Sequence, residues 1–435
     1  MKLKISNGHV IDPASQIDGL HDILIAEDKI VAVVPIGATN TDFVPDQIID
    51  ASDLIVCPGL IDLCARLHGP SQKQGATIAS ETVAAVKGGI TTLCIPPDTS
   101  PVIDTPAVIE YIEDQGEKSA LSKLLVVGAI TQNIEGNLLS EMAALKDAGC
   151  VGISNALAPL KNSLIQQRAM EYAASIGLTV FINAIESSLQ AKGCVHEGSI
   201  STRLGLAGIP ETAETIAVAR DLLLIEQTGV CAHFCHISTS RAVEMIAIAQ
   251  QKGLPVTADV TPHHLHLAEH DIGNYDALCH VIPPLRSIRD REGLQQGLRS
   301  GIISAISSDH RPLDDDAKLG PFAETIPGIS GLETLLSLTM KLVDDEILPL
   351  QQAIASLTIN PANILGIDTG RISAGAPADL CIFNPNAHYE CEPDKTLSAG
   401  KNTPFGSWLF TNEVSHTIVN GKIVYQQGVA QSNHP

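Results

Sequence analysis

Both ends of the chain carry short runs in which hydrophobic and polar residues alternate, with turn-forming residues between them. The first part contains such runs at residues 3–5, 10–11, 22–25, 30–34 and 47–49. The pattern returns near the end of the chain at residues 379–383, 407–410, 416–419 and 421–425. Alternation over a few residues is typical of half-buried strands. We therefore expect residues 1–55 and 368–435 to form the two halves of one small β-sandwich domain.

The middle of the chain, residues 56–367, alternates short apolar runs with stretches of helical periodicity. The apolar runs lie at residues 91–95, 124–129, 151–154, 179–183, 229–236, 255–261 and 302–309, and helical spacing appears at 211–226, 240–252 and 333–343. Strands that alternate with helices over such a length predict a parallel sheet covered by helices. The number of repeats fits an α/β fold, a TIM-type (β/α)8 barrel of about eight units.

Charge and composition narrow the classes of function. The 435 residues include 27 Lys and Arg against 49 Asp and Glu, which gives a formal net charge of −22. Nucleic-acid binding depends on positive charge that neutralises phosphates, so we expect no nucleic-acid partner and no anionic membrane partner. No apolar run approaches the ~20 residues of a membrane helix. The ten cysteines are scattered, many within apolar runs, which favours reduced thiols in a cytoplasmic protein.

A series of short motifs runs through the whole chain. They include Pro58-Gly59-Leu60-Ile61-Asp62, Gly88-Gly89-Ile90-Thr91-Thr92, His236-Ile237-Ser238-Thr239, Pro262-His263-His264-Leu265, Pro283-Pro284-Leu285-Arg286 and Lys401-Asn402-Thr403-Pro404-Phe405. In their order they resemble the amidohydrolase superfamily, and specifically the dihydroorotases of the longer, bacterial type. The resemblance implies the barrel of the metal-dependent hydrolases. In such enzymes zinc at the barrel mouth activates a water that attacks a cyclic amide.

Most of the metal-ligand positions that this resemblance marks hold other residues. Cys64 and Arg66 stand in place of the first H-x-H, Asn155 and Asn183 replace a carboxylate and a histidine, and only His236 and Asp309 are retained. Residues i and i+2 on a strand face the same side, so Arg66 would direct a fixed positive charge at the metal position. We expect no metal cofactor and a buried ion pair between Arg66 and Asp309. Asp309 would be a vestigial general acid/base, Cys64 an inert thiol, and His236 a hydrogen-bonded core histidine.

The positions that would bind substrate in this family differ in parallel. They are His68, in place of an arginine, Asp98 and Ile282, each in place of an asparagine, and Arg311, which follows the aspartate of the last strand. A histidine lacks the planar fork with which arginine binds a carboxylate. A carboxylate at Asp98 would repel an anionic substrate. So many changes together indicate a dismantled catalytic site.

Three functions remain open from the sequence. The first is a catalytically inactive dihydroorotase homologue, which the resemblance implies is a scaffold subunit for aspartate transcarbamoylase in pyrimidine biosynthesis, in a hetero-oligomer, plausibly a dodecamer. The second is an active cyclic amidohydrolase that acts on dihydroorotate or another cyclic amide or imide, with one zinc ion on Cys64 and the two retained ligands. The third is a regulator in which Arg66, His68 and Arg311 hold an anion in the old pocket.

Overall fold

Eight parallel strands form the central barrel, and a computed structural model describes residues 1–37, 43–67, 75–427 and 429–430 of the chain. In sheet order the strands are β6 (Leu60–Asp62), β7 (Ile90–Ile95), β8 (Lys123–Ala129), β9 (Gly152–Ser154), β10 (Thr179–Ile182), β13 (Ala232–Phe234), β14 (Val256–Val260) and β15 (Ala305–Ile306). A parallel bridge between Ala65 and His310 joins the first strand to the last. There Arg66 N donates to His310 O at 2.8 Å, and His310 N donates to Cys64 O at 3.1 Å. The predicted barrel is confirmed.

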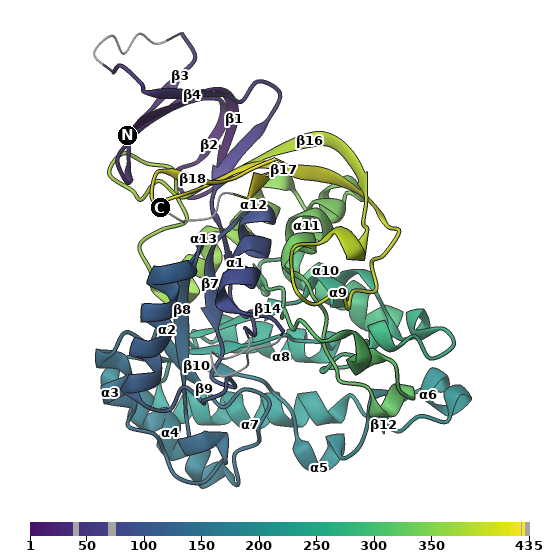
Figure 1. Cartoon of the computed structure of the whole chain (residues 1–435). Helices are drawn as coiled ribbons and strands as arrows, with labels where there is room; N and C mark the ends of the chain where they lie inside the picture. The colour runs from purple at the N-terminus through teal and green to yellow at the C-terminus, as the bar shows by residue number, and fades with distance from the viewer. Residues whose placement is uncertain (38–42, 68–74, 428, 431–435) are drawn as a thin grey trace.

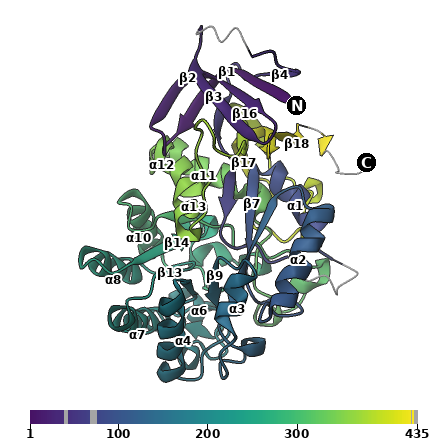
Figure 2. The ribbon, with the colours of Figure 1, turned by 90° about the vertical axis from the view of Figure 1, so that its left-hand side faces the viewer.

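Helices cover the outside of the barrel, and Figure 2 shows α1 and α2 on the side opposite α8 and α10. The longer helices are α1 (Ile78–Lys87), α2 (Pro106–Ser119), α4 (Ser163–Ile176), α7 (Thr212–Thr228), α8 (Ser240–Gln251), α10 (Ile288–Arg299), α11 (Leu335–Asp344) and α12 (Leu350–Leu357). Shorter helices are α3 (Met142–Asp147), α5 (Ser187–Gln190), α6 (Ser199–Leu204), α9 (Pro262–His266) and α13 (Ile359–Leu365). Within the described residues, no helix is both long enough and apolar enough to traverse a lipid bilayer.

The two ends of the chain share one sheet of nine strands, which lies at one end of the barrel in Figure 1. Its strands are β1 (Lys2–Asp12), β2 (Ile17–Ala26), β3 (Lys29–Pro35), β4 (Gln47–Asp50), β5 (Ile55–Pro58), β16 (Leu380–Glu390), β17 (Leu409–Val419), β18 (Lys422–Gln426) and β19 (Val429–Ala430). The central strand is β5, which pairs in parallel with β1 and antiparallel with β16. The strand-rich domain is thus confirmed, although its strands form one continuous hydrogen-bonded sheet and not two.

The barrel and the β-domain share part of their buried core, although the β-domain also has a buried cluster of its own. One buried cluster contains Leu60 and Ile90 of the barrel together with Cys381 and Phe383 of the β-domain. Gly89 lies at this junction with φ of +82°, and a Cβ added there would come within 2.5 Å of the Cys381 sulfur. A glycine is therefore required both by the backbone conformation and by the close approach of the two domains.

Candidate functional site

Five residues singled out from the sequence meet where the barrel strands end. Cys64 and Arg66 follow β6, Asp98 follows β7, His236 follows β13 and Asp309 follows β15. Because parallel strands end at one edge, side chains far apart in the sequence come together there. This is the edge at which (β/α)8 barrels carry their active sites. The predicted substrate residue His68 lies outside the described residues.

The guanidinium of Arg66 lies between two carboxylates. Its Nε donates to Asp98 Oδ2 at 2.9 Å, and its Nη1 contacts Asp309 Oδ1. The side chains of Arg66 and Asp309 are only 11% and 12% exposed. Burial disfavours the charge of Arg66, but the two carboxylates outweigh burial and hold its pKa well above the ordinary value. The predicted ion pair is present, and Asp98 forms a second one.

The contact with Arg66 changes the interpretation of Asp98. From the sequence its carboxylate was expected to repel an anionic substrate. In the structure Oδ2 is neutralised by the Arg66 guanidinium, whereas the other oxygen, Oδ1, is buried with no hydrogen-bond partner among the described residues. Asp98 therefore balances a buried cation at the barrel mouth.

Asp309 is the common neighbour of the other groups. Its Oδ1 lies 3.7 Å from Cys64 Sγ and 3.8 Å from His236 Nδ1, in addition to the contact with Arg66. Burial by itself would raise the pKa of Asp309, but His236 and Arg66 hold this pKa well below its usual range. A general acid or base works best with a pKa near the operating pH. Asp309 is instead fixed as an ionised ion-pair partner.

The backbone is strained at two of these positions. Asp309 and His236 have φ values of 45° and 53°, in the left-handed region that non-glycine residues rarely adopt. The turn at His236 is held by Asp259, whose Oδ1 accepts from His236 N at 2.6 Å and whose Oδ2 lies 3.0 Å from His233 Nε2. Asp259 was not among the predicted site residues, although an acid inside the apolar run 255–261 was a usable signal.

His236 differs from the expectation of a fully hydrogen-bonded core histidine. The side chain is buried, but its Nε2 has no hydrogen-bond partner within the described part of the chain. Asp259 Oδ1 lies 4.0 Å from Nε2, which is too far for a hydrogen bond. The carboxylate of Asp259 is already engaged by the backbone of His236 and by His233, so the ring of His236 is left incompletely bonded.

The substituted asparagines have separate surroundings. Asn155 is bonded on both sides of its amide: Oδ1 accepts from Thr131 Oγ1 at 2.7 Å, and Nδ2 donates to Ala158 O at 2.9 Å and Ile134 O at 3.3 Å. The amide therefore connects, through these hydrogen bonds, the loops that follow β8 and β9. Asn183 has a buried Oδ1 without a hydrogen-bond partner among the described residues.

The donor set does not fit the zinc centre that the resemblance implies. Cys64, His236 and Asp309 do place three ligand-type atoms within 4.8 Å of one another. However, burial raises the pKa of the Cys64 thiol well above its ordinary value, so the thiol is protonated near neutral pH. The Arg66 guanidinium contacts the same Asp309 oxygen and would repel a dication. No metal-dependent step is therefore assigned to these residues.

The remaining substrate-pocket positions are Arg311 and Ile282. Burial and the charge of Arg66 lower the pKa of Arg311, whereas Asp98 and Asp309 favour its charged form. Lys318 lies nearby, and burial lowers its pKa to about 8 while Nζ donates to His280 O at 3.1 Å. Ile282 is half-buried and has no polar group in its side chain.

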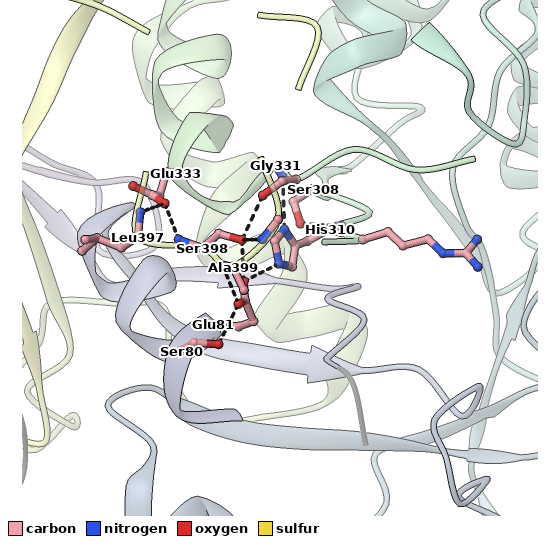
Figure 3. A network of polar contacts seen from close by, with 12 residues as sticks. Ser80, Glu81, Ser308, His310, Gly331, Glu333, Leu397, Ser398 and Ala399 are labelled. Atoms are coloured by element: carbon pink, nitrogen blue, oxygen red, sulfur yellow. Dashed lines mark hydrogen bonds and ion pairs between the residues drawn. The ribbon is translucent and has the colours of Figure 1, made fainter. Parts of the chain in front are cut away.

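Behind these residues, His310 connects the last strand to α1 and to the C-terminal segment (Figure 3). Its Nε2 lies 2.9 Å from Glu81 Oε2, and its Nδ1 accepts from Gly331 N at 3.1 Å. Glu81 also accepts from Ser398 Oγ at 2.7 Å and from Ala399 N at 3.0 Å. Burial opposes the charge of Glu81, but the contact with His310 and the other donors lowers its pKa to about 2. The network holds the barrel mouth in place, and it was not predictable from the sequence because its partners lie up to 318 positions apart.

Comparison with known proteins indicates the family to which the chain belongs. A family model described as dihydro-orotase-like matches residues 53–242, and a model of the amidohydrolase family matches residues 229–425. A dihydroorotase-like protein of Pseudomonas aeruginosa is 43% identical over 98% of this chain and 100% of its own. A dihydroorotase of Syntrophus aciditrophicus is 39% identical over 98% of this chain and 100% of its own.

Solved structures agree on the fold. The L-hydantoinase (dihydropyrimidinase) from Arthrobacter aurescens superposes with a TM-score of 0.87 at 23% identity, covering 99% of this chain and 97% of its own. The dihydropyrimidinase from Brevibacillus agri gives a TM-score of 0.85 at 20% identity, covering 99% and 96%. At this level of identity the likeness concerns architecture alone. The full-length match to the closer relatives shows that the chain belongs to the dihydroorotase-like family of amidohydrolases.

Proposed function

We propose that this chain is a catalytically inactive dihydroorotase homologue. The observation that carries the proposal is the Arg66 guanidinium, which lies against Asp98 and Asp309 at the barrel mouth. Hydrolysis of a cyclic amide in this family requires a metal-activated water and an aspartate that accepts its proton. Here a cation that cannot be deprotonated contacts that aspartate, and the residues beside it do not make a zinc site.

Metal content and activity of the purified chain test this proposal. We expect far less than one zinc per chain by inductively coupled plasma mass spectrometry, and no opening of dihydroorotate followed by ultraviolet absorbance. The double variant Cys64→His/Arg66→His removes the cation and restores two imidazole ligands, so it should gain zinc toward about one ion per chain. A native chain that held about one zinc and opened dihydroorotate would contradict the proposal.

The retained fold supports a role as a scaffold. The chain keeps both the barrel and the β-domain, and it matches its relatives over essentially their full length although the catalytic positions have changed. We place it in the cytoplasm, in a hetero-oligomer with the catalytic chain of aspartate transcarbamoylase, where it serves pyrimidine biosynthesis through its surface. A dodecamer with equal numbers of the two chains is the assembly that we propose.

Association can be measured with the two purified chains. Mixed with the aspartate transcarbamoylase catalytic chain of the same organism, this protein should elute with it in one peak. Size-exclusion chromatography with light scattering would then give the mass of the complex and the ratio of the chains. Separate elution of the two chains at micromolar concentrations would overturn the scaffold role, whatever the zinc content proves to be.

A further inference from the structure

Two cations near the barrel mouth have no acidic partner. Arg311 and Lys318 both lie in the segment that follows β15, the eighth strand of the barrel. Neither side chain forms an ion pair among the described residues, whereas Arg66 is held by two carboxylates. Residues 68–74, which lie outside the described residues, contain no Asp or Glu. Two positive charges therefore lie here without a described carboxylate in contact with them.

The side chain of Arg311 is held in place although its guanidinium is unpaired. Asn402 Nδ2 donates to Arg311 O and to Gly328 O, each at 3.0 Å. Gly328 has φ of +141°, and a Cβ added there would come within 2.7 Å of Arg311 Cδ, so the aliphatic part of Arg311 packs directly on this glycine. The guanidinium makes no hydrogen bond within the described part of the chain, and Arg311 is partly exposed. Its N–H donors are therefore positioned and available to a ligand.

Lys318 is anchored beside the same glycine. Its Nζ donates to His280 O at 3.1 Å, and Gly328 N donates to that carbonyl at 2.9 Å. Burial and the charge of Arg311 lower the pKa of Lys318 to about 8, so the ammonium group is still largely charged at pH 7. This is the only hydrogen bond of Nζ among the described residues, and an ammonium group has three donors. Lys318 thus presents a second cation with free donors close to Arg311.

The place of the two cations in the barrel suits a phosphate group. The loops after the seventh and eighth strands of (β/α)8 barrels frequently form phosphate sites. Here His280 follows β14, the seventh strand, and Arg311 and Lys318 follow the eighth. Arginine binds phosphate through two parallel hydrogen bonds, and lysine adds a compact point charge. The acidic residues 314–316 are exposed, where dissolved salt screens their charge.

We propose that Arg311 and Lys318 bind a phosphate group, either as inorganic phosphate or as the phosphoryl group of a monoester. The guanidinium would donate to two phosphate oxygens, and Lys318 Nζ would donate to a third while it keeps its bond to His280 O. A phosphoryl group carries a charge of about −1.5 to −2 at pH 7, which matches the two cations. The site requires no metal, and the inference does not depend on whether the barrel is catalytic.

Thermal-shift measurements on the full chain at pH 7 and constant ionic strength test the proposal. We expect inorganic phosphate or glycerol 3-phosphate, each at about 20 mM, to raise Tm by about 2 °C, because a ligand of the folded chain stabilises it. Sodium acetate at the same ionic strength should give no shift. Of the two phosphates, the one with the lower Kd identifies whether the site takes free phosphate or a monoester. If neither raises Tm, or if acetate raises it equally, the proposal is wrong.

Variants locate the site. Arg311→Met and Lys318→Met each remove one charge and keep most of the aliphatic stem, so each should weaken the Kd for phosphate about tenfold or more in isothermal titration. Arg289→Met on α10 and Lys252→Met after α8 are the matched controls, because both side chains are exposed, and they should leave Kd unchanged. If Arg311→Met does not fold, Lys318→Met gives the same test. Unchanged Kd in the Arg311 and Lys318 variants would place the phosphate elsewhere and overturn the proposal.

Discussion

Arg66 shows how one substitution at the end of a strand changes the role of the side chains around it. A histidine at this position could bind a metal together with Asp309. The guanidinium of Arg66 instead binds the carboxylate of Asp309 directly, and it also binds Asp98. Each of the two carboxylates would carry a large desolvation cost if it were left alone in a buried site. The three side chains therefore stabilise one another, and removal of any one of their charges would destabilise the folded chain.

We predict that Arg66→Met lowers the free energy of unfolding by about 3–5 kcal/mol, because it leaves Asp98 and Asp309 as uncompensated buried charges. Urea denaturation at pH 7 measures the change. Arg168→Met is the control, since Arg168 forms an ion pair with Glu171 on an exposed helix surface, where its side chain is 63% exposed. A loss no larger for Arg66→Met than for the control would show that the ion pairs at the barrel mouth are unimportant for stability.

Asn155 gives a second prediction at the level of a single residue. Its Nδ2 donates to two backbone carbonyls, so Asn155→Asp would set a carboxylate against them and remove both donors. We expect a loss of about 1–3 kcal/mol at pH 7. The carbonyls raise the pKa of the new carboxyl in the folded state, so the loss should shrink as the pH falls and the group is protonated. Urea titrations at pH 7 and pH 4 compare the two conditions, and an equal loss at both would contradict the prediction.

The candidate site was only partly predictable, and the reason is the range of its interactions. The ion pair between Arg66 and Asp309 was predictable from the sequence, because alternate residues of a strand share a face and parallel strands end at the same edge of the barrel. The ion pair of Asp98 with Arg66 was not predictable in this way. The charge of Asp98 alone suggested that it would repel an anion, and not that a residue 32 positions away would neutralise it. The unfilled hydrogen-bonding capacity of His236 depends on Asp259 being used elsewhere, which only the packed structure shows.

At the scale of elements, the carboxylate of Glu81 connects α1 to the end of the chain. The fully buried side chain accepts from His310, Ser398 and Ala399, and so joins the helix to β15 and to the segment before β17. We predict that Glu81→Gln lowers the free energy of unfolding at pH 7 by about 2–4 kcal/mol, since the new amide group would face donors.

The pH dependence of this effect follows from the pKa of Glu81, which is lowered from 4.5 to about 2 in the folded chain. A lowered pKa stabilises the fold above pH 4.5, and the stabilisation is lost as the pH falls toward 2. The difference between the wild type and Glu81→Gln should therefore shrink over this range in chemical denaturation. Glu110→Gln, on the exposed surface of α2, should show no such trend. A difference that stayed constant from pH 5 to pH 2 would contradict the assignment.

Element boundaries were predicted best where periodicity alone decides them. The stretch expected to be helical at residues 240–252 is α8, Ser240–Gln251. By contrast, the run at residues 302–309 yields only Ala305–Ile306 as a strand. At the start of the run, the backbone N–H groups of Ile302 and Ile303 donate to Gly297 O in the turn after α10. At its end, Ser308 N donates to the side chain of Asp62 at 2.8 Å. Strand propensity does not predict that a side chain will accept a hydrogen bond in place of a neighbouring backbone carbonyl.

For the whole molecule, the shared core predicts that the barrel and the β-domain unfold together. The strand β5 lies between segments from both ends of the chain, and one buried cluster spans both parts. The single tryptophan, Trp408, packs against another buried cluster, and its ring centroid lies 5.0 Å from that of Phe405 and 6.2 Å from that of His266 on α9 of the barrel. Its fluorescence therefore reports on the contact of the segment before β17 with the barrel.

Chains of this size often unfold through intermediates, so a single transition would be informative. We predict that the tryptophan fluorescence and the far-ultraviolet circular dichroism give urea midpoints that agree to within about 0.2 M, because coincident transitions are the mark of one cooperative unit. The expectation follows from the order of the sheet: removing the C-terminal strands would leave β5 without its antiparallel partner and expose the apolar cluster beneath it. A fluorescence transition at clearly lower urea than the dichroism transition would mean that the junction opens while the barrel is still folded, and would contradict a common core.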